Sequence, residues 1–262
     1  MKLSISNIGW IAENDIELYG LMKQLGFEGL EIAPTRTFPD NPYERLEEAK
    51  IWKKELALNY GFTIPSMQSI WYGRQEKLFG SNEERKILID YTKKAIDFAE
   101  VIGCKNLVFG CPKNRNVPEG QNSLQAVSFF KEIGDYAYLH HTVIGMEANP
   151  TIYSTNYIND TAAAINLIKQ TNSKGFLLNL DLGTMIQNKE EIKELEGNVS
   201  LINHVHISEP GLKPIEERIL HKELYDLLSS ETYNGFISIE MGKADNVNVL
   251  KMKMEYVRSI FR

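Results

Sequence analysis

The chain has 262 residues, of which 43% are hydrophobic and 24% are charged, and its formal net charge is −6. These values are ordinary for a folded globular protein, and we expect one domain over residues 1–262. The acidic balance argues against a large footprint on a nucleic-acid backbone, so no nucleic-acid partner is expected.

The first ten residues alternate as a strand does, and Glu13 and Asp15 follow before a signal-type apolar core could form. No apolar stretch is long enough to span a bilayer, so no membrane partner is expected. Cys104 and Cys111 are expected to stay reduced, because a chain of this size with a full core needs no disulfide. We therefore expect a cytoplasmic protein.

Short apolar runs alternate with helical periodicity along the chain, which predicts eight strand–helix units. In the first four units the strands are expected near 3–8, 29–32, 63–67 and 106–109, and the helices near 16–25, 43–60, 82–102 and 123–139. In the last four the strands are expected at 143–147, 176–181, 203–206 and 235–240, and the helices near 157–169, 189–195, 215–228 and 245–260. The loops at 71–81 and 110–121 are long and contain several basic residues.

This alternation, with no linker, predicts a single (β/α)₈ TIM barrel. An open doubly wound sheet would also alternate, but no glycine-rich phosphate fingerprint follows any strand. The last four strands end on Glu147, Asp181, His206 and Glu240. Because the ends of parallel barrel strands lie on one face, these side chains are predicted to bind one divalent cation: manganese, magnesium, cobalt or zinc.

Such a site indicates an enzyme acting on a small oxygenated substrate. A cation that binds two adjacent substrate oxygens acidifies the neighbouring C–H, because the enediolate charge develops on a metal-bound oxygen. Glu147 and Glu240 are the predicted acid/base pair. A single acidic residue at a strand end is more often a helix cap or an ion-pair partner, but four metal-compatible residues on consecutive strands favour a metal site.

Several other residues are candidates to contact a substrate. Lys113 and Arg115 follow the fourth strand and are candidates to bind a phosphate or carboxylate, with a solvated loop as the alternative. Trp71 could stack on a sugar face or close the pocket, with core or loop packing as the alternative, and Asn149 could hydrogen-bond hydroxyl groups or fix the loop.

Two residues beside the predicted metal set have open interpretations. His204 and His206 alternate in one strand and point to the same side, so His206 is taken as the ligand and His204 as a barrel-lining or supporting residue. Glu31 ends the second strand, where we expect an ion pair inside the barrel mouth first and a substrate contact second.

Three strings resemble the sugar phosphate isomerase/epimerase family: GMEANP at 145–150, NLDLGTM at 179–185 and HVHISEP at 204–210. That family has the xylose-isomerase-like TIM barrel, which also hosts ketose 3-epimerases, hydroxypyruvate isomerases, inosose dehydratases and endonuclease IV-type DNA-repair enzymes. The resemblance covers essentially the whole chain. It implies a Glu, Asp, His, Glu metal set, matched by Glu147, Asp181, His206 and Glu240, with the two glutamates as acid and base.

The chain departs from the ketose 3-epimerases where those enzymes bind sugar. Thr184 replaces a substrate-binding His, Tyr153 replaces a Glu, and Leu212 replaces an Arg, with Lys213 next. The resemblance therefore does not extend to free-ketose 3-epimerisation specifically. Within these motifs, Thr184 and Glu209 are still predicted to contact the substrate.

The sequence thus predicts a metal-dependent isomerase or epimerase whose partner is a small-molecule sugar or sugar phosphate. A keto-sugar or inosose-type dehydratase is the alternative enzyme, and a non-catalytic carbohydrate-binding protein is the alternative from another class. A DNA-repair endonuclease needs a trinuclear zinc cluster, for which five histidines are too few. A homo-oligomer is compatible with this barrel class, and the sequence leaves the oligomeric state open.

Overall fold

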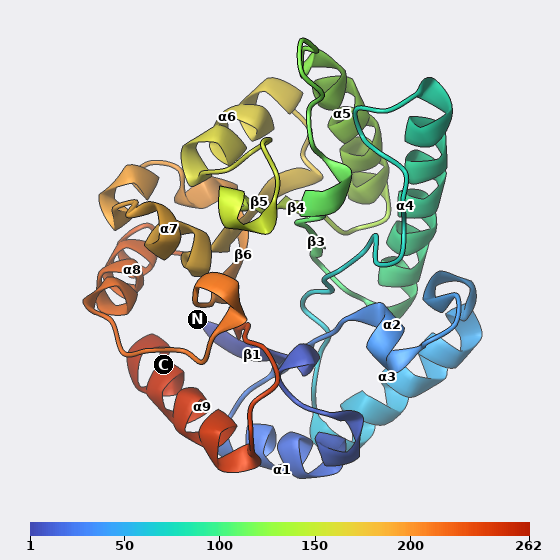
Figure 1. The fold of residues 1–262 in the computed structure, drawn as a ribbon. Helices are drawn as coiled ribbons and strands as arrows, with labels where there is room; N and C mark the ends of the chain where they lie inside the picture. Colours follow the sequence, from blue (N-terminus) through green and yellow to red (C-terminus); the bar gives the residue numbers. More distant parts are fainter.

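In the computed structural model, which describes residues 1–262, parallel strands form a barrel that is surrounded by helices (Figure 1). The strands are hydrogen-bonded in the order β2-β1-β7-β6-β5-β4-β3. They are β1 Lys2–Ser6, β2 Gly29–Glu31, β3 Leu107–Phe109, β4 Ile144–Met146, β5 Phe176–Asp181, β6 Ile202–Ile207 and β7 Phe236–Ile239. The helices are α1 Asp15–Leu25, α2 Pro34–Thr37, α3 Leu46–Tyr60, α4 Asn82–Ile102, α5 Leu124–Leu139, α6 Thr161–Thr171, α7 Leu182–Asn188, α8 Ile219–Ser230 and α9 Val247–Phe261.

An irregular segment around Pro65 closes the barrel between β2 and β3. The Leu30 N–H donates to the Thr63 carbonyl at 3.0 Å, and the Met67 N–H donates to the Asn106 carbonyl at 2.9 Å. Pro65 has no N–H to donate, which explains why this segment forms isolated bridges where the sequence predicts a third regular strand. The closed ring of pairings confirms the predicted barrel and excludes the open-sheet alternative.

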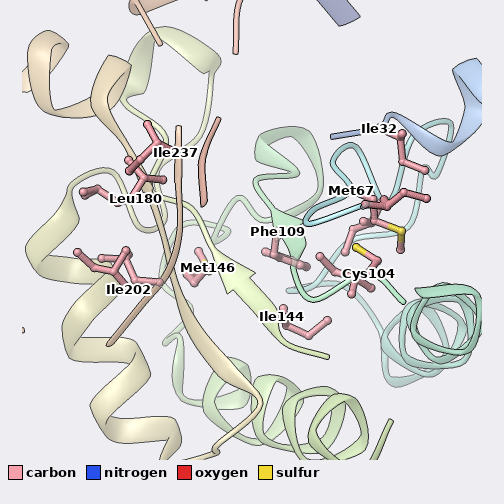
Figure 2. Packing of buried hydrophobic residues seen from close by; sticks show 14 of the residues in the cluster. Ile32, Met67, Cys104, Phe109, Ile144, Met146, Leu180, Ile202 and Ile237 are labelled. Atoms are coloured by element: carbon pink, nitrogen blue, oxygen red, sulfur yellow. The ribbon is translucent and has the colours of Figure 1, made fainter. Parts of the chain in front are cut away.

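Alternation along the strands separates an apolar layer from a polar barrel interior. In β6, Val205 and Ile207 belong to the hydrophobic core, whereas His204 and His206 contact Glu31 across the barrel. Figure 2 shows part of the hydrophobic core, including Ile32 and Met67 at the closing seam. The buried polar residues that result include Ser6, Glu31, Ser66, Asn106, Asn179, His204, His206 and Ser238. The barrel interior therefore supplies polar side chains beneath the predicted metal site.

The helix of the sixth unit differs from its predicted position near 189–195. It is α7, which begins at Leu182 directly after β5, because the Asp181 side chain accepts a hydrogen bond from the Thr184 N–H and caps the helix. Lys189, with a φ of 60°, ends it, and only a 3₁₀ turn at Ile192–Leu195 follows.

The cysteines and the helices have two further features. Cys104 and Cys111 are free, and burial raises the pKa of the Cys104 thiol to about 12. None of the helices combines the length and the apolar character that crossing a membrane requires.

The packing of β7 in the apolar layer gives a stability prediction. Ile237 is fully buried and pairs with Leu3 and Val205, so Ile237→Ala should lower the free energy of unfolding by about 2–5 kcal/mol through lost burial and a cavity. Ile16 is 77% exposed on α1, so the control Ile16→Ala should change it by less than about 0.5 kcal/mol. Urea unfolding measures both, and equal losses would contradict the packing described.

Candidate metal centre

The four predicted ligands lie at the carboxyl ends of four adjacent strands. Glu147 follows β4, Asp181 ends β5, His206 lies in β6 opposite Asp181, and Glu240 follows β7. The strand ladder continues to the glutamates, since the Glu147 N–H donates to the Phe109 carbonyl and the Glu240 N–H donates to the Ile207 carbonyl. The backbone pairing of the barrel thus fixes where each of these side chains starts.

The side chains of this set converge on one point. One potential ligand atom from each of Glu147, Asp181, His206 and Glu240 lies within 4.8 Å of the other three. The His206 Nδ1 atom lies 3.2 Å from Glu147 Oε1 and 3.2 Å from Glu240 Oε2. His206 is fully buried, and the two glutamates are 9% and 8% exposed.

The ionisation of these side chains reflects three crowded carboxyl groups around one imidazole. Burial raises the pKa of Glu240 to about 7, and burial together with the Glu147 carboxylate raises the pKa of Asp181 to about 6. Although burial disfavours a charged imidazole, the Glu240 and Glu31 carboxylates raise the pKa of His206 well above its usual value. The set therefore attracts positive charge at its centre.

This donor set fits a divalent cation. Donor atoms that share one cation at about 2.0–2.2 Å lie up to about 4.4 Å apart, which is close to the observed spread of the four side chains. Three oxygens and one nitrogen form a mixed, mainly hard set that suits manganese, magnesium, cobalt or zinc. Glu147, Asp181, His206 and Glu240 would hold the cation, with His206 using its Nδ1 atom.

The Nε2 side of the His206 ring contacts Glu31, which ends β2. The His206 Nε2 atom lies 2.9 Å from Glu31 Oε2, and the His204 Nε2 atom lies 3.0 Å from the same oxygen. Although burial would raise the pKa of Glu31, the His206 and His204 contacts lower it. Gln68 donates to Glu31 Oε1 at 3.3 Å. The expected ion pair in the barrel mouth is therefore present, and it orients the imidazole so that Nδ1 faces the other ligands.

Asp181 is positioned by α7 and β6. The Thr184 backbone N–H donates to Asp181 Oδ2 at 2.7 Å, its hydroxyl lies 2.8 Å from the same oxygen, and the Ser208 hydroxyl donates to Asp181 Oδ1. Asp181 thus serves as a helix cap and as a member of the convergent set. Thr184, predicted to contact the substrate, is 1% exposed, also lies 2.8 Å from the Ala148 carbonyl, and does not line the cavity.

Glu147 is fixed by two amides and an arginine. The Asn149 side chain donates to Glu147 Oε2, and the Asn179 side chain donates to Glu147 Oε1, both at 3.0 Å. Arg115 is fully buried and donates to the Glu147 carbonyl at 2.9 Å and to the Asn149 side-chain oxygen at 3.0 Å. The prediction that Arg115 binds an anionic group of the substrate is therefore wrong, because its guanidinium is enclosed within the loops that support Glu147.

The remaining predicted substrate contacts have different positions. Glu209 lines the cavity, but its carboxylate is 2% exposed and is held by Arg218, whose Nε donates to Oε1 at 2.7 Å. Trp71 is 2% exposed and donates through its indole N–H to Thr92 Oγ1, so its ring packs in the core. Lys113 is exposed on the loop after β3.

A cavity of about 170 Å³ opens above the convergent carboxylates. It is lined mainly by polar residues, and three members of the predicted metal set, Glu147, Asp181 and Glu240, are among them. Tyr153 and Leu212, at positions where the sequence departs from the ketose 3-epimerase pattern, also line it. The complete lining is Gln68, Ser69, Val108, Gly110, Cys111, Pro112, Glu147, Asn149, Tyr153, Asp181, Ser208, Glu209, Leu212 and Glu240.

Sequence reasoning missed the supporting residues Gln68, Asn179 and Ser208. Asn179 carried a local signal, because it lies two residues before Asp181 and therefore points to the same side of the strand. Gln68 carried none, since it lies in the irregular segment that closes the barrel. Ser208 lies two residues after His206, but its bond to Asp181 depends on the β5–β6 pairing.

Comparison with known proteins agrees with this architecture. A family model described as a xylose isomerase-like TIM barrel matches residues 20–260. No curated protein matches the chain. Solved structures match the chain over nearly its full length. Their sequence identity to the chain is low, so the match shows a shared fold alone.

Three of these structures illustrate the likeness. The 3-keto-D-glucoside 4-epimerase of E. coli has a TM-score of 0.77 at 19% identity, with 99% of each chain covered. D-psicose 3-epimerase from Clostridium cellulolyticum H10 has a TM-score of 0.79 at 16% identity, with 100% of each chain covered. The probable 3-DHS dehydratase of Bacillus anthracis has a TM-score of 0.71 at 15% identity, with 97% of this chain and 98% of that chain covered.

The ionisation of the ligand set predicts proton-linked metal binding. At pH 5.5 the carboxyl groups of Asp181 and Glu240, with pKa values of about 6 and 7, hold protons that a cation must displace, so Mn²⁺ affinity should rise by at least about tenfold between pH 5.5 and 7.5. Calorimetry in buffers with different heats of ionisation would count the released protons. Asp181→Asn should weaken binding at least about tenfold, which locates the ion. Affinity that stays constant over this range without proton release would contradict the prediction.

The contact between Glu31 and His206 gives a second prediction. Glu31→Gln should weaken metal binding by about 10–100-fold, because a neutral amide holds the imidazole less strongly than a carboxylate does. Glu28→Gln is the matched control, since Glu28 is exposed just before the same strand. Calorimetric titration with the metal measures the affinity of both variants. Equal affinity in the wild type and in Glu31→Gln would show that Glu31 does not position the ligand.

Proposed function

The chain belongs to the xylose isomerase-like TIM barrel family, and we propose that it is a divalent-metal-dependent isomerase or epimerase of a sugar or sugar phosphate. One observation carries the proposal: Glu147 and Glu240 each lie 3.2 Å from the same His206 nitrogen at the wall of a polar cavity. Two carboxylates on either side of a cation position can remove and return a proton on carbon.

The two glutamates differ in how firmly they are held. Glu147 accepts hydrogen bonds from Asn149 and Asn179, whereas the Glu240 carboxylate has His206 as its side-chain partner. Burial raises the pKa of Glu240 to about 7, which suits a group that both takes up and releases a proton near neutral pH. We assign Glu240 the larger part in proton transfer and Glu147 the larger part in metal binding.

The chemistry requires a polarised carbonyl beside the carbon that loses its proton. A bound divalent cation would polarise that carbonyl and acidify the adjacent C–H. Glu240 would hold or move the proton, while Asn149 and Asn179 keep the Glu147 carboxylate in place. Tyr153 accepts a hydrogen bond from the Gly211 N–H, and its own O–H can donate to a sugar oxygen in the cavity.

Several features support a sugar over a less polar substrate. Only four of the fourteen residues around the cavity are hydrophobic, and its volume of about 170 Å³ suits a small hydroxylated molecule. Two of the three structural neighbours described above carry the names of sugar epimerases. The third is a probable dehydratase, and elimination of a β-hydroxyl is the alternative outcome of the same proton abstraction.

The proposed function predicts metal-dependent exchange of carbon-bound hydrogen. The protein loaded with Mn²⁺ should incorporate solvent deuterium into at least one member of a keto-sugar panel, and a chelator should stop the exchange. Glu240→Gln should reduce the rate at least about 100-fold while sugar binding persists, because the amide cannot act as a base. Glu55→Gln, an exposed change on α3, is the matched control and should keep the wild-type rate.

The outcomes separate the candidate functions. Undiminished exchange in metal-loaded Glu240→Gln would remove Glu240 from the mechanism. Sugar binding without exchange in the wild type would favour a carbohydrate-binding protein. Release of an enone, seen as new ultraviolet absorbance, would favour the dehydratase.

A further inference from the structure

A second cavity of about 500 Å³ adjoins the one above the candidate metal centre. Both cavities are lined by Ser69, Cys111 and Pro112, so these residues form a shared wall. The outer cavity, here called the outer groove, lies between the loop after the barrel-closing segment and the loop after β3. Its lining is Ser69, Trp71, Tyr72, Gly73, Arg74, Gln75, Lys77, Cys111, Pro112, Lys113 and Asn114.

The shared wall has an unusual backbone on both loops. Ser69 has a φ of 56° and Cys111 a φ of 46°, although neither is glycine. Left-handed backbone at non-glycine residues is uncommon, and Ser69 and Cys111 are two of the ten such residues in the chain. The turn at each position carries its loop from the inner cavity into the outer groove.

The outer groove is preformed, because hydrogen bonds join its two loops. The Asn114 side chain donates to the Arg74 carbonyl at 3.1 Å and to the Glu76 carbonyl at 2.8 Å. The Leu78 N–H donates to the Asn114 carbonyl at 2.8 Å, and the Lys77 ammonium donates to the Lys113 carbonyl at 2.8 Å. A ligand therefore meets an ordered surface, which lowers the entropy cost of binding.

The two cavities carry opposite charge. The inner cavity is lined by Glu147, Asp181, Glu209 and Glu240 and by no lysine or arginine. The outer groove is lined by Arg74, Lys77 and Lys113 and by no aspartate or glutamate, although the whole chain has a net charge of −6.

The charges within the outer groove differ in availability. Arg74 pairs with Glu76 and lies over the Tyr91 ring, so its charge is already compensated. Lys77 and Lys113 are exposed, and neither forms an ion pair with a carboxylate. Their ammonium groups come from two loops fixed against each other, so they can approach one anion from two directions.

We propose that the outer groove binds an anionic group, a phosphate or a carboxylate, at the end of the sugar remote from the metal, with Lys77 and Lys113 as its contacts. This inference rests on the proposed function and deepens it, because it selects acidic or phosphorylated keto-sugars as the substrate class. The reacting carbonyl end would occupy the inner cavity, beside its carboxylates. The opposite polarity of the two cavities then sets the direction in which the substrate binds.

The test compares substrates with and without an anionic group. Deuterium exchange by the metal-loaded protein is measured with fructose, fructose 6-phosphate and 5-keto-gluconate, and the preference is the ratio of kcat/KM for an anionic sugar to that for fructose. The wild type should prefer one of the anionic sugars at least about tenfold, and Lys77→Gln/Lys113→Gln should reduce that preference at least about tenfold. The anionic sugar whose preference falls more in the variant carries the type of group, phosphate or carboxylate, that the outer groove binds.

The matched control removes the same charge elsewhere. Lys50→Gln/Lys54→Gln changes two exposed lysines on α3 and should keep the wild-type preference within about twofold. A preference for fructose in the wild type, or an unchanged preference in Lys77→Gln/Lys113→Gln, would overturn the inference.

A failure of the proposed function is distinguishable from a failure of this inference. If no sugar exchanges deuterium, calorimetric binding of fructose 6-phosphate to the wild type and to Lys77→Gln/Lys113→Gln still tests the groove. Binding at least about tenfold weaker in the variant supports the anion site without the activity. Equal binding by both proteins overturns the anion site.

Discussion

The arrangement of this site depends on one buried imidazole that is held from both sides. The Nε2 atom of His206 lies 2.9 Å from Glu31, and its Nδ1 atom lies 3.2 Å from both Glu147 and Glu240. Glu31 comes from β2, which is separated by β1 and β7 from β6, the strand that carries His206. The contact therefore couples the position of β2 to the geometry of the candidate metal centre, because a shift of β2 would move the carboxylate that orients the imidazole.

Around this imidazole, each carboxylate is fixed to a different degree. Asp181 is held by Thr184 and Ser208, and Glu147 by two asparagine amides, whereas the Glu240 carboxylate has His206 as its only side-chain partner. Firm ligands favour a defined metal geometry, and a less constrained carboxylate favours proton transfer. The hydrogen bonds thus support different roles for Glu147 and Glu240, although the two side chains are chemically the same.

The inner cavity and the outer groove differ in charge. Three carboxylates of the convergent set are crowded together and favour a cation between them, while Lys77 and Lys113 give the outer groove a positive charge. A substrate with a carbonyl at one end and an acidic group at the other would match both sites. The chain therefore combines the convergent Glu, Asp, His, Glu set with a basic groove formed by its loops, and loop variation on a constant barrel is how this architecture changes substrate.

The sequence by itself determined the strand and helix alternation, the placement of metal-compatible residues at four strand ends, and the common side of His204 and His206, because each follows from local periodicity. Only the tertiary structure decided the parts that depend on distant segments. In the folded chain, Arg115 is buried and donates to the Glu147 carbonyl, and Thr184 donates to Asp181. Glu31 contacts His206, and the Lys77 ammonium donates to the Lys113 carbonyl. Loop conformation and contacts between strands far apart in the chain leave no local period, so spacing alone could not assign these roles.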